Sequence, residues 1–191
     1  IFGAMMAGAS WVPVNIRNSI KTNIDYMEYV HTKWLFFDSF LELELTEKKH
    51  NLKSLRKAIC IDKKLDEYLS VNEFCAQSDE TLLSDLSDPF GAPDLIFSRW
   101  PTGGTTGPSK GVEMTNSNIL TMFELGIKHY VGTNNENIVH LAVAPITHAA
   151  GLLIGIFSSS NGTTIIHENF NAEQVLIEIE KSKVTHIFLP P

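Results

Sequence analysis

The chain is organised around one glycine-rich stretch, Thr102-Gly103-Gly104-Thr105-Thr106-Gly107-Pro108-Ser109-Lys110-Gly111. Glycine allows the backbone to take positive φ angles and to lie close to a ligand. Successive backbone N–H groups in such a turn can point into one concavity, which binds anions. Threonine hydroxyls add donors, and Lys110 adds a mobile positive charge that suits a phosphate. The stretch therefore predicts a loop that binds phosphate groups.

The residues on both sides of this loop predict strands. The apolar run Leu95-Ile96-Phe97 precedes the loop, and Val112 and Met114 alternate with polar residues after it. We therefore expect two strands that carry the loop between them. A flexible surface hairpin without a ligand is the alternative interpretation. Such a hairpin needs only about one or two glycines and no lysine, so the composition of the loop argues against it.

The loop differs from two common nucleotide-binding motifs. In the phosphate loop of the common NTPases, glycine directly precedes the lysine and a hydroxyl residue follows it to hold Mg²⁺. Here Ser109 precedes the lysine and Gly111 follows it. The dinucleotide-binding fingerprint has another glycine spacing and leads into a helix, whereas this loop leads into a predicted strand.

The loop resembles the phosphate-loop signature of the adenylate-forming (AMP-binding) enzymes, Thr-Ser/Gly-Gly-Thr-Thr-Gly-x-Pro-Lys-Gly. This family includes acyl- and aryl-CoA synthetases, peptide-synthetase adenylation domains and luciferases. Pro108-Ser109 stands where x-Pro is usual. Two more segments agree in order and spacing: residues 7–15 resemble Ala-Gly-Ala-x-x-x-Pro-x-Asn, and residues 144–151 resemble Pro-x-x-His-x-x-Gly. The chain looks most like a fatty acyl-CoA synthetase.

The resemblance implies an activity and a set of site residues. The activity is ATP-dependent activation of a carboxylic acid, fatty or aryl, to an acyl-adenylate, followed by thioester formation with CoA. ATP, Mg²⁺ and CoA are the implied cofactors and substrates. His148 is expected beside the carboxylate substrate, and Lys110 is expected to stabilise charge on the leaving pyrophosphate. The residues expected to bind the ATP phosphates are Thr102, Gly103, Gly104, Thr105, Thr106, Gly107 and Lys110.

The resemblance also places the chain within a larger enzyme. We expect residues 1–191 to be an internal part of the N-terminal AMP-binding domain, without the C-terminal domain, and to be inactive alone. The family's adenine, ribose and Mg²⁺ ligands and its adenylation lysine are expected beyond Pro191, so no metal ligand is assigned here. Two alternatives remain open: an adenylation domain that loads a carrier protein, and a non-enzymatic phosphate-binding α/β module.

Composition limits the partners. The chain has 43% hydrophobic and 19% charged residues, which is typical of a globular domain. A formal net charge of −7 argues against a nucleic-acid partner or an anionic membrane. No apolar run is long enough to span a bilayer. Cys60 and Cys75 are too few for a disulfide framework, so we expect reduced thiols in a cytoplasmic protein.

Apolar periodicity predicts alternating strands and helices, hence an α/β fold with βαβ units and a mainly parallel sheet flanked by helices. Residues 1–7 are expected to form a buried helix that ends near Gly8. The lysine-rich region around residues 48–64 is interpreted as a solvated helix face rather than an anion site. His129, His140, His167 and His186 have no recognisable partners and are assigned no role. Expected strands are 10–14, 34–40, 58–62, 95–97, 112–114, 137–145, 162–167 and 185–190, and expected helices are 23–31, 46–57, 80–85, 117–128, 148–157 and 171–181.

Overall fold

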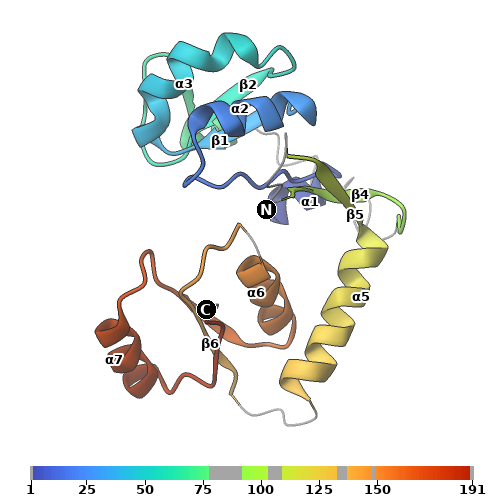
Figure 1. Ribbon diagram of the computed structural model, residues 1–191, viewed down its shortest axis with the longest axis vertical. Coiled ribbons are helices and arrows are strands. Elements are labelled where there is room, and N and C mark those ends of the chain that lie inside the picture. Colours follow the sequence, from blue (N-terminus) through green and yellow to red (C-terminus); the bar gives the residue numbers. More distant parts are fainter. Residues whose placement is uncertain (1, 78–91, 103–108, 133–136, 148, 190–191) are drawn as a thin grey trace. The chain divides into compact units, whose positions relative to one another are not determined.

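Helices and strands alternate along the chain in a computed structural model that describes residues 2–77, 92–102, 109–132, 137–147 and 149–189 (Figure 1). The chain forms two compact units, Ile1–Thr115 and Asn116–Pro191. The helix expected at 80–85 lies outside the described residues. Residues 103–108, which include most of the predicted phosphate-binding residues, and His148 also lie outside them.

The first unit contains a parallel three-stranded sheet in the order β1-β2-β3. Trp34 pairs with Lys57 in register, and Cys60 pairs with Ser70. The core between sheet and helices is made by Ile24, Met27, Phe37, Leu45, Leu52, Cys60 and Tyr68. The elements are α2 (Ile20–Tyr29), β1 (Trp34–Phe37), α3 (Glu42–Lys48), β2 (Lys57–Cys60), β3 (Leu69–Ser70) and α4 (Val71–Ala76), with 3₁₀ turns at Ser39–Leu41 and Lys49–Asn51.

Side-chain caps explain where several of these elements begin. The Ser19 hydroxyl accepts a hydrogen bond from the Thr22 N–H at 3.1 Å at the start of α2. Ser70 and Glu73 form a reciprocal capping box at the start of α4. Asp62, just after β2, accepts hydrogen bonds from the Ser39 hydroxyl and N–H, which lower the pKa of its carboxyl to about 2.

The first unit also contains the predicted hairpin. Strands β4 (Ile96–Pro101) and β5 (Gly111–Thr115) pair antiparallel. Trp11 extends this sheet: its N–H donates to the Phe97 carbonyl at 2.9 Å, and its carbonyl accepts from the Arg99 N–H at 2.9 Å. The Trp11 and Trp100 rings meet edge to face, 5.3 Å apart. The expected strand at residues 10–14 is thus reduced to a single bridge at Trp11.

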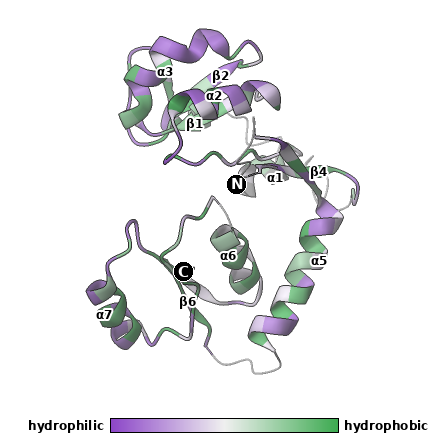
Figure 2. Cartoon of the chain, in the orientation of Figure 1, coloured by the Kyte–Doolittle hydropathy of each residue, from purple (hydrophilic) through white to green (hydrophobic). Residues whose placement is uncertain are grey.

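The second unit has a parallel sheet in the order β7-β6-β8. Helix α6 connects β6 to β7 and α7 connects β7 to β8, so both connections are βαβ units, and the predicted α/β class is confirmed. Figure 2 shows that α6 is mostly hydrophobic in colour, whereas α7 is mixed. The elements are α5 (Asn116–Gly126), a π-helical turn (Ile127–Val131), β6 (Val139–Ala142), α6 (Ala149–Ser159), β7 (Thr163–Ile166), α7 (Ala172–Ser182) and β8 (His186–Ile187).

Glycines bring helices α5 and α6 into close contact. A Cβ atom at Gly126 would lie 2.4 Å from Cδ1 of Ile156, and one at Gly155 would lie 2.3 Å from Cζ of Phe123. Ile156 and Phe157 of α6 are buried, and so is Ile119 of α5. The interface between these two helices therefore depends on the absence of side chains at both glycines.

The structure corrects one expected helix, adds two elements that were not expected, and exposes a helix that was expected to be buried. The helix expected at 46–57 is α3, Glu42–Lys48; its acidic first turn and basic last turn suit the helix dipole, and Lys57 already belongs to β2. Strand β3 and helix α4 were not expected. Helix α1, Phe2–Met6, forms as expected, but its residues Gly3 and Met6 are exposed, so the expected burial of this helix is wrong for them.

Candidate functional site

The hairpin holds the two ends of the glycine-rich loop together. Pro101 and Gly111 form the last pair of the β4–β5 ladder. One step further, the Thr102 N–H donates to the Lys110 carbonyl at 2.8 Å, and the Lys110 N–H donates to the Thr102 hydroxyl at 3.2 Å. The loop is therefore closed at its base by two hydrogen bonds. The residues between them, Gly103 to Pro108, lie outside the described part of the chain.

Thr102 and Lys110 differ in how their side chains are engaged. The Thr102 hydroxyl accepts the Lys110 N–H, and it keeps a hydrogen of its own that it can donate to another acceptor. The Lys110 side chain is exposed to solvent, so its ammonium group is accessible to a ligand. The Thr102 side chain thus helps to close the base of the loop, while the Lys110 side chain presents a positive charge there.

One buried side chain, that of Tyr26, joins the hairpin to α2, and two further side-chain contacts lie within the hairpin itself. The hydroxyl of Tyr26, on α2, donates to the Arg99 carbonyl on β4 at 3.1 Å. Trp100 donates from its indole N–H to the hydroxyl of the fully buried Ser98 at 2.6 Å. On the exposed side, Arg99 and Glu113 form an ion pair across the two strands at 2.9 Å. The loop is therefore carried by a hairpin with a well-defined position in this unit.

The segment at residues 144–151, apart from His148, covers the turn after β6 and the first three residues of α6. It follows the carboxyl end of the central strand of the second unit's sheet, where open α/β sheets bind ligands. A Cβ atom at Gly151 would lie only 2.1 Å from the Ile146 carbonyl oxygen. Gly151 therefore allows this turn to fold tightly over the start of the helix. His148 lies outside the described residues, immediately before Ala149, the first residue of α6.

Residues 1–191 match the profile of the AMP-binding enzyme family. The chain belongs to this family. Curated relatives include the 2-succinylbenzoate–CoA ligases of Staphylococcus aureus strains JH9 and Newman, which are 38% identical over 99 residues. That alignment covers 51% of this chain and 20% of each relative, so it spans only a fifth of the relatives' length.

Solved structures of adenylate-forming enzymes share the fold of this AMP-binding chain. A putative long-chain-fatty-acid CoA ligase from Rhodopseudomonas palustris has a TM-score of 0.80 at 20% identity, covering 96% of this chain and 45% of that one. The o-succinylbenzoate CoA synthetase from Bacillus subtilis, bound to its acyl-adenylate intermediate, has a TM-score of 0.69 at 19% identity, with coverages of 96% and 43%. At these identities the likeness concerns the fold.

In this AMP-binding chain, His140 is a fully buried histidine of β6. Its ring stacks 4.6 Å from the Phe157 ring, and its Nδ1 lies 3.4 Å from the Thr164 hydroxyl. Burial, with a smaller contribution from His186, lowers the pKa of His140 to about 4. His140 is therefore neutral near pH 7. The sequence assigned it no role, and its contacts identify it as a packing residue. Its Nε2 atom is buried and has no hydrogen-bond partner among the described residues.

His167, Glu178 and Ser182 form a polar chain that does not have the order of a catalytic triad. Ser182 donates to the Glu178 carboxylate, which lies 3.6 Å from the His167 imidazole. A nucleophilic serine needs a base hydrogen-bonded to its hydroxyl and oriented by a third group, with the imidazole in the middle. Here the carboxylate is in the middle. These contacts therefore connect α7 to the residue after β7 and do not indicate nucleophilic catalysis.

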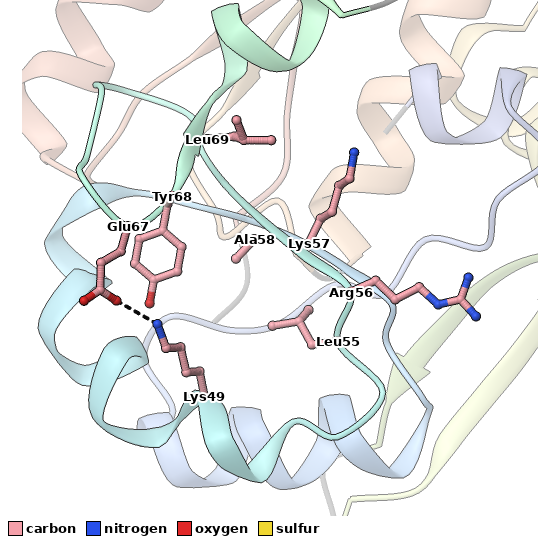
Figure 3. Close-up of a pocket in the computed structure, with 8 residues that line it drawn as sticks. All are labelled: Lys49, Leu55, Arg56, Lys57, Ala58, Glu67, Tyr68 and Leu69. Carbon is pink, nitrogen blue, oxygen red and sulfur yellow. Dashed lines mark hydrogen bonds and ion pairs between the residues drawn. The ribbon is translucent and has the colours of Figure 1, made fainter.

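A pocket of about 310 Å³ in the first unit does not form an anion site (Figure 3). Lys49 is paired with Glu67 at 2.7 Å, and the Lys57 ammonium lies over the Trp34 ring. In Figure 3 the Arg56 side chain points away from the Lys49–Glu67 pair. The pocket is lined by Lys49, Leu55, Arg56, Lys57, Ala58, Glu67, Tyr68 and Leu69. Its cations do not converge on one point.

The described residues contain neither a cluster of metal ligands nor a helix that could span a membrane. Among the described residues, no group of three or more His, Cys, Asp or Glu is placed to hold a metal ion. Within the same part of the chain, the helices lack the combination of length and apolarity needed to cross a bilayer. Cys60 is buried and Cys75 is exposed, and the two are not joined by a disulfide.

Proposed function

We propose that this chain carries the phosphate-binding loop of an enzyme that activates a carboxylic acid with ATP and transfers the acyl group to CoA. The observation that carries the proposal is the loop between β4 and β5, whose base is closed by Thr102 and Lys110. Membership of the AMP-binding family and the names of the curated relatives, which are CoA ligases, support it. The chain covers 20% of those relatives, so we propose that it is part of the N-terminal domain of a longer protein.

In the proposed first step, a carboxylate oxygen attacks the α-phosphorus of ATP. A bond forms between that oxygen and the phosphorus, and the bond from the phosphorus to the β-phosphate oxygen breaks. The leaving pyrophosphate gains negative charge. We propose that the exposed Lys110 ammonium and the N–H groups of the loop stabilise that charge, while the closed base holds the phosphates in line.

The other loop residues contribute hydroxyls and close approach. Thr102, Thr105 and Thr106 supply hydroxyl donors, and Gly103, Gly104 and Gly107 allow the backbone N–H groups to approach the phosphates. His148, which directly precedes α6 in the sequence, is proposed to lie beside the carboxylate of the acid. Mg²⁺, when bound to ATP, would neutralise phosphate charge; among the described residues no three or more His, Cys, Asp or Glu gather to hold a metal ion, and no role for this chain in holding Mg²⁺ is proposed.

We propose that the acid is fatty or aryl. The curated relatives are named for 2-succinylbenzoate, an aryl acid, and one similar structure is a putative long-chain-fatty-acid CoA ligase. In the second proposed step, the CoA thiol attacks the acyl carbon of the adenylate, a thioester forms, and AMP leaves. We propose a reducing, cytoplasmic compartment, because the two cysteines are not joined by a disulfide.

The test is carboxylate-dependent exchange of labelled pyrophosphate into ATP by the intact protein. The acids would be 2-succinylbenzoate, benzoate, octanoate and palmitate, each with and without CoA. We expect exchange with at least one acid and a thioester product when CoA is added. Exchange without thioester would move the assignment to an enzyme that loads a carrier protein. Phosphate binding without exchange by any acid would leave a non-enzymatic module. We expect residues 1–191 alone to form no acyl-adenylate.

A further inference from the structure

We propose that Tyr26 is a positioning residue for the glycine-rich loop, acting through the backbone of the hairpin to set how ATP is bound. The inference rests on the proposed function for its consequence in catalysis, but its structural part concerns only the hairpin. Tyr26 lies on α2, far from the loop in sequence, and its ring is buried, with 4% of the residue exposed.

The first contact of Tyr26 is with β4. Its hydroxyl donates to the Arg99 carbonyl at 3.1 Å, and the Arg99 N–H donates to the Trp11 carbonyl at 2.9 Å. Both backbone groups of Arg99 are therefore bonded to partners other than β5. Arg99 comes shortly before Pro101, where the ladder ends and the loop begins. The phenol thus holds the strand that enters the loop.

The second contact is with β5. A Cβ atom at Gly111 would lie 3.3 Å from the Tyr26 hydroxyl oxygen and 3.4 Å from Cγ1 of Val30. Gly111 directly follows Lys110 and pairs with Pro101. The end of one tyrosine side chain therefore lies against both strands at the base of the loop. A shift of this ring would change the positions of Thr102 and Lys110 together.

The phenol remains a hydrogen-bond donor in all ordinary assay conditions. Burial raises the pKa of Tyr26 to about 12, although the nearby Arg99 charge acts in the opposite direction. The bond to the Arg99 carbonyl is therefore intact from acidic to mildly basic pH. Loss of this bond by mutation should consequently have an effect that does not depend on pH between 6 and about 10.

The test compares Tyr26→Phe with Tyr68→Phe in the intact protein. Tyr68 is a matched control, because it is also buried in the first unit and its hydroxyl is bonded to the Thr46 hydroxyl at 2.9 Å, away from the hairpin. For Tyr26→Phe we expect kcat/KM for ATP in pyrophosphate exchange to fall about five- to tenfold, with KM for the acid unchanged. For Tyr68→Phe we expect neither constant to change.

A second measurement does not depend on activity. Hydrogen–deuterium exchange of peptides that cover residues 99–115 should be about tenfold faster in Tyr26→Phe than in wild type, and unchanged in Tyr68→Phe. Equal exchange rates in wild type and Tyr26→Phe would overturn the proposal. If the wild-type protein shows no pyrophosphate exchange, the proposed function fails, and the deuterium experiment still decides whether Tyr26 positions the loop.

A double-mutant cycle with Gly111→Ala isolates the contact. In the wild-type background the added methyl group meets the tyrosine hydroxyl, so we expect it to lower kcat/KM for ATP. In the Tyr26→Phe background that oxygen is absent, and the same substitution should have a smaller effect. If the double mutant's loss in kcat/KM for ATP equals the product of the losses in the two single mutants, Tyr26 and Gly111 are not coupled, and the positioning role would be rejected.

Discussion

Thr102 and Lys110 each donate a backbone N–H group to the other across the base of the glycine-rich loop, one to a carbonyl at 2.8 Å and one to a hydroxyl at 3.2 Å. The backbone of Lys110 is thereby fixed, while its side chain remains exposed. The Thr102 hydroxyl therefore helps to fix the backbone at the base of the loop, and the Lys110 side chain provides the positive charge. The two contributions can be separated by mutation.

Removal of the lysine charge should affect the chemical step. In the intact protein, Lys110→Ala should slow adenylation by about two to three orders of magnitude, the range for losing one transition-state donor. Acid-dependent pyrophosphate exchange measures this effect. Lys21→Ala, which changes an exposed lysine on α2, is the control and should leave the rate unchanged. A Lys110→Ala enzyme with the wild-type rate would show that the lysine does not contact the phosphates.

Removal of the hydroxyl at the loop base should have a smaller effect. Thr102→Val keeps the side-chain shape but leaves the Lys110 N–H without its acceptor, so kcat/KM for ATP should fall about three- to tenfold. Thr102→Ser keeps an acceptor and should restore most of the activity. If serine and valine give the same rate, the hydroxyl has no part in holding the loop.

The two strands that flank the loop and the βαβ order of the second unit could be predicted from the sequence, because apolar alternation is a local signal. The helix expected at 171–181 forms as α7, and its start is also local: the Asn171 side chain accepts a hydrogen bond from the Gln174 N–H at 3.0 Å. In contrast, β3 has only the residues Leu69–Ser70, and it is a strand because β2 lies beside it. Such a short element has no periodicity of its own.

Long-range contacts explain what the sequence could not predict at the candidate site. Tyr26 and Arg99 are 73 positions apart, so no spacing rule connects them. The burial of His140 likewise depends on Phe157 and Thr164, which belong to other elements. The roles of Lys110 and His148 rest on motifs, and they remain predictions until the kinetic tests are done.

His148 should affect the acid more than ATP. If its side chain lies beside the carboxylate, His148→Ala should raise KM for the acid about tenfold and change KM for ATP little. Steady-state kinetics with each substrate varied in turn would show the difference. His129→Ala, at a histidine with no assigned role, is the control. Equal and small effects on both substrates would indicate that His148 only packs at the start of α6.

Gly151 should be required for the close approach of α6 to the turn at Ile146. A methyl group there would lie 2.1 Å from the Ile146 carbonyl oxygen, and a backbone atom cannot move aside without shifting the turn. We expect Gly151→Ala to lower the free energy of unfolding by about 1–3 kcal/mol, the usual range for overpacking, although alanine by itself favours helix. Urea unfolding of the intact protein measures this, with Gly3→Ala, at a helical glycine with open space around it, as control. Equal stabilities for wild type and Gly151→Ala would contradict the prediction.

His140 should make the stability of the fold sensitive to acid. Its pKa is about 4 in the folded protein and 6.5 in an unfolded chain, because burial and the neighbouring His186 disfavour the charged form. Below pH 6.5 the unfolded chain binds a proton at this position and the folded protein does not. The stabilisation is therefore complete above pH 6.5 and is lost as the pH falls towards 4, with a slope of up to about 1.4 kcal/mol per pH unit.

The variant that isolates this effect is His140→Phe, which keeps an aromatic ring against Phe157 and cannot be protonated. Urea unfolding of wild type and variant at intervals from pH 7.5 to 4 should give a difference in unfolding free energy that changes in favour of the variant as the pH falls. Other titrating groups are common to both proteins and cancel in the difference. Parallel curves for the two proteins over this range would show that His140 is protonated in the folded state as readily as in the unfolded chain.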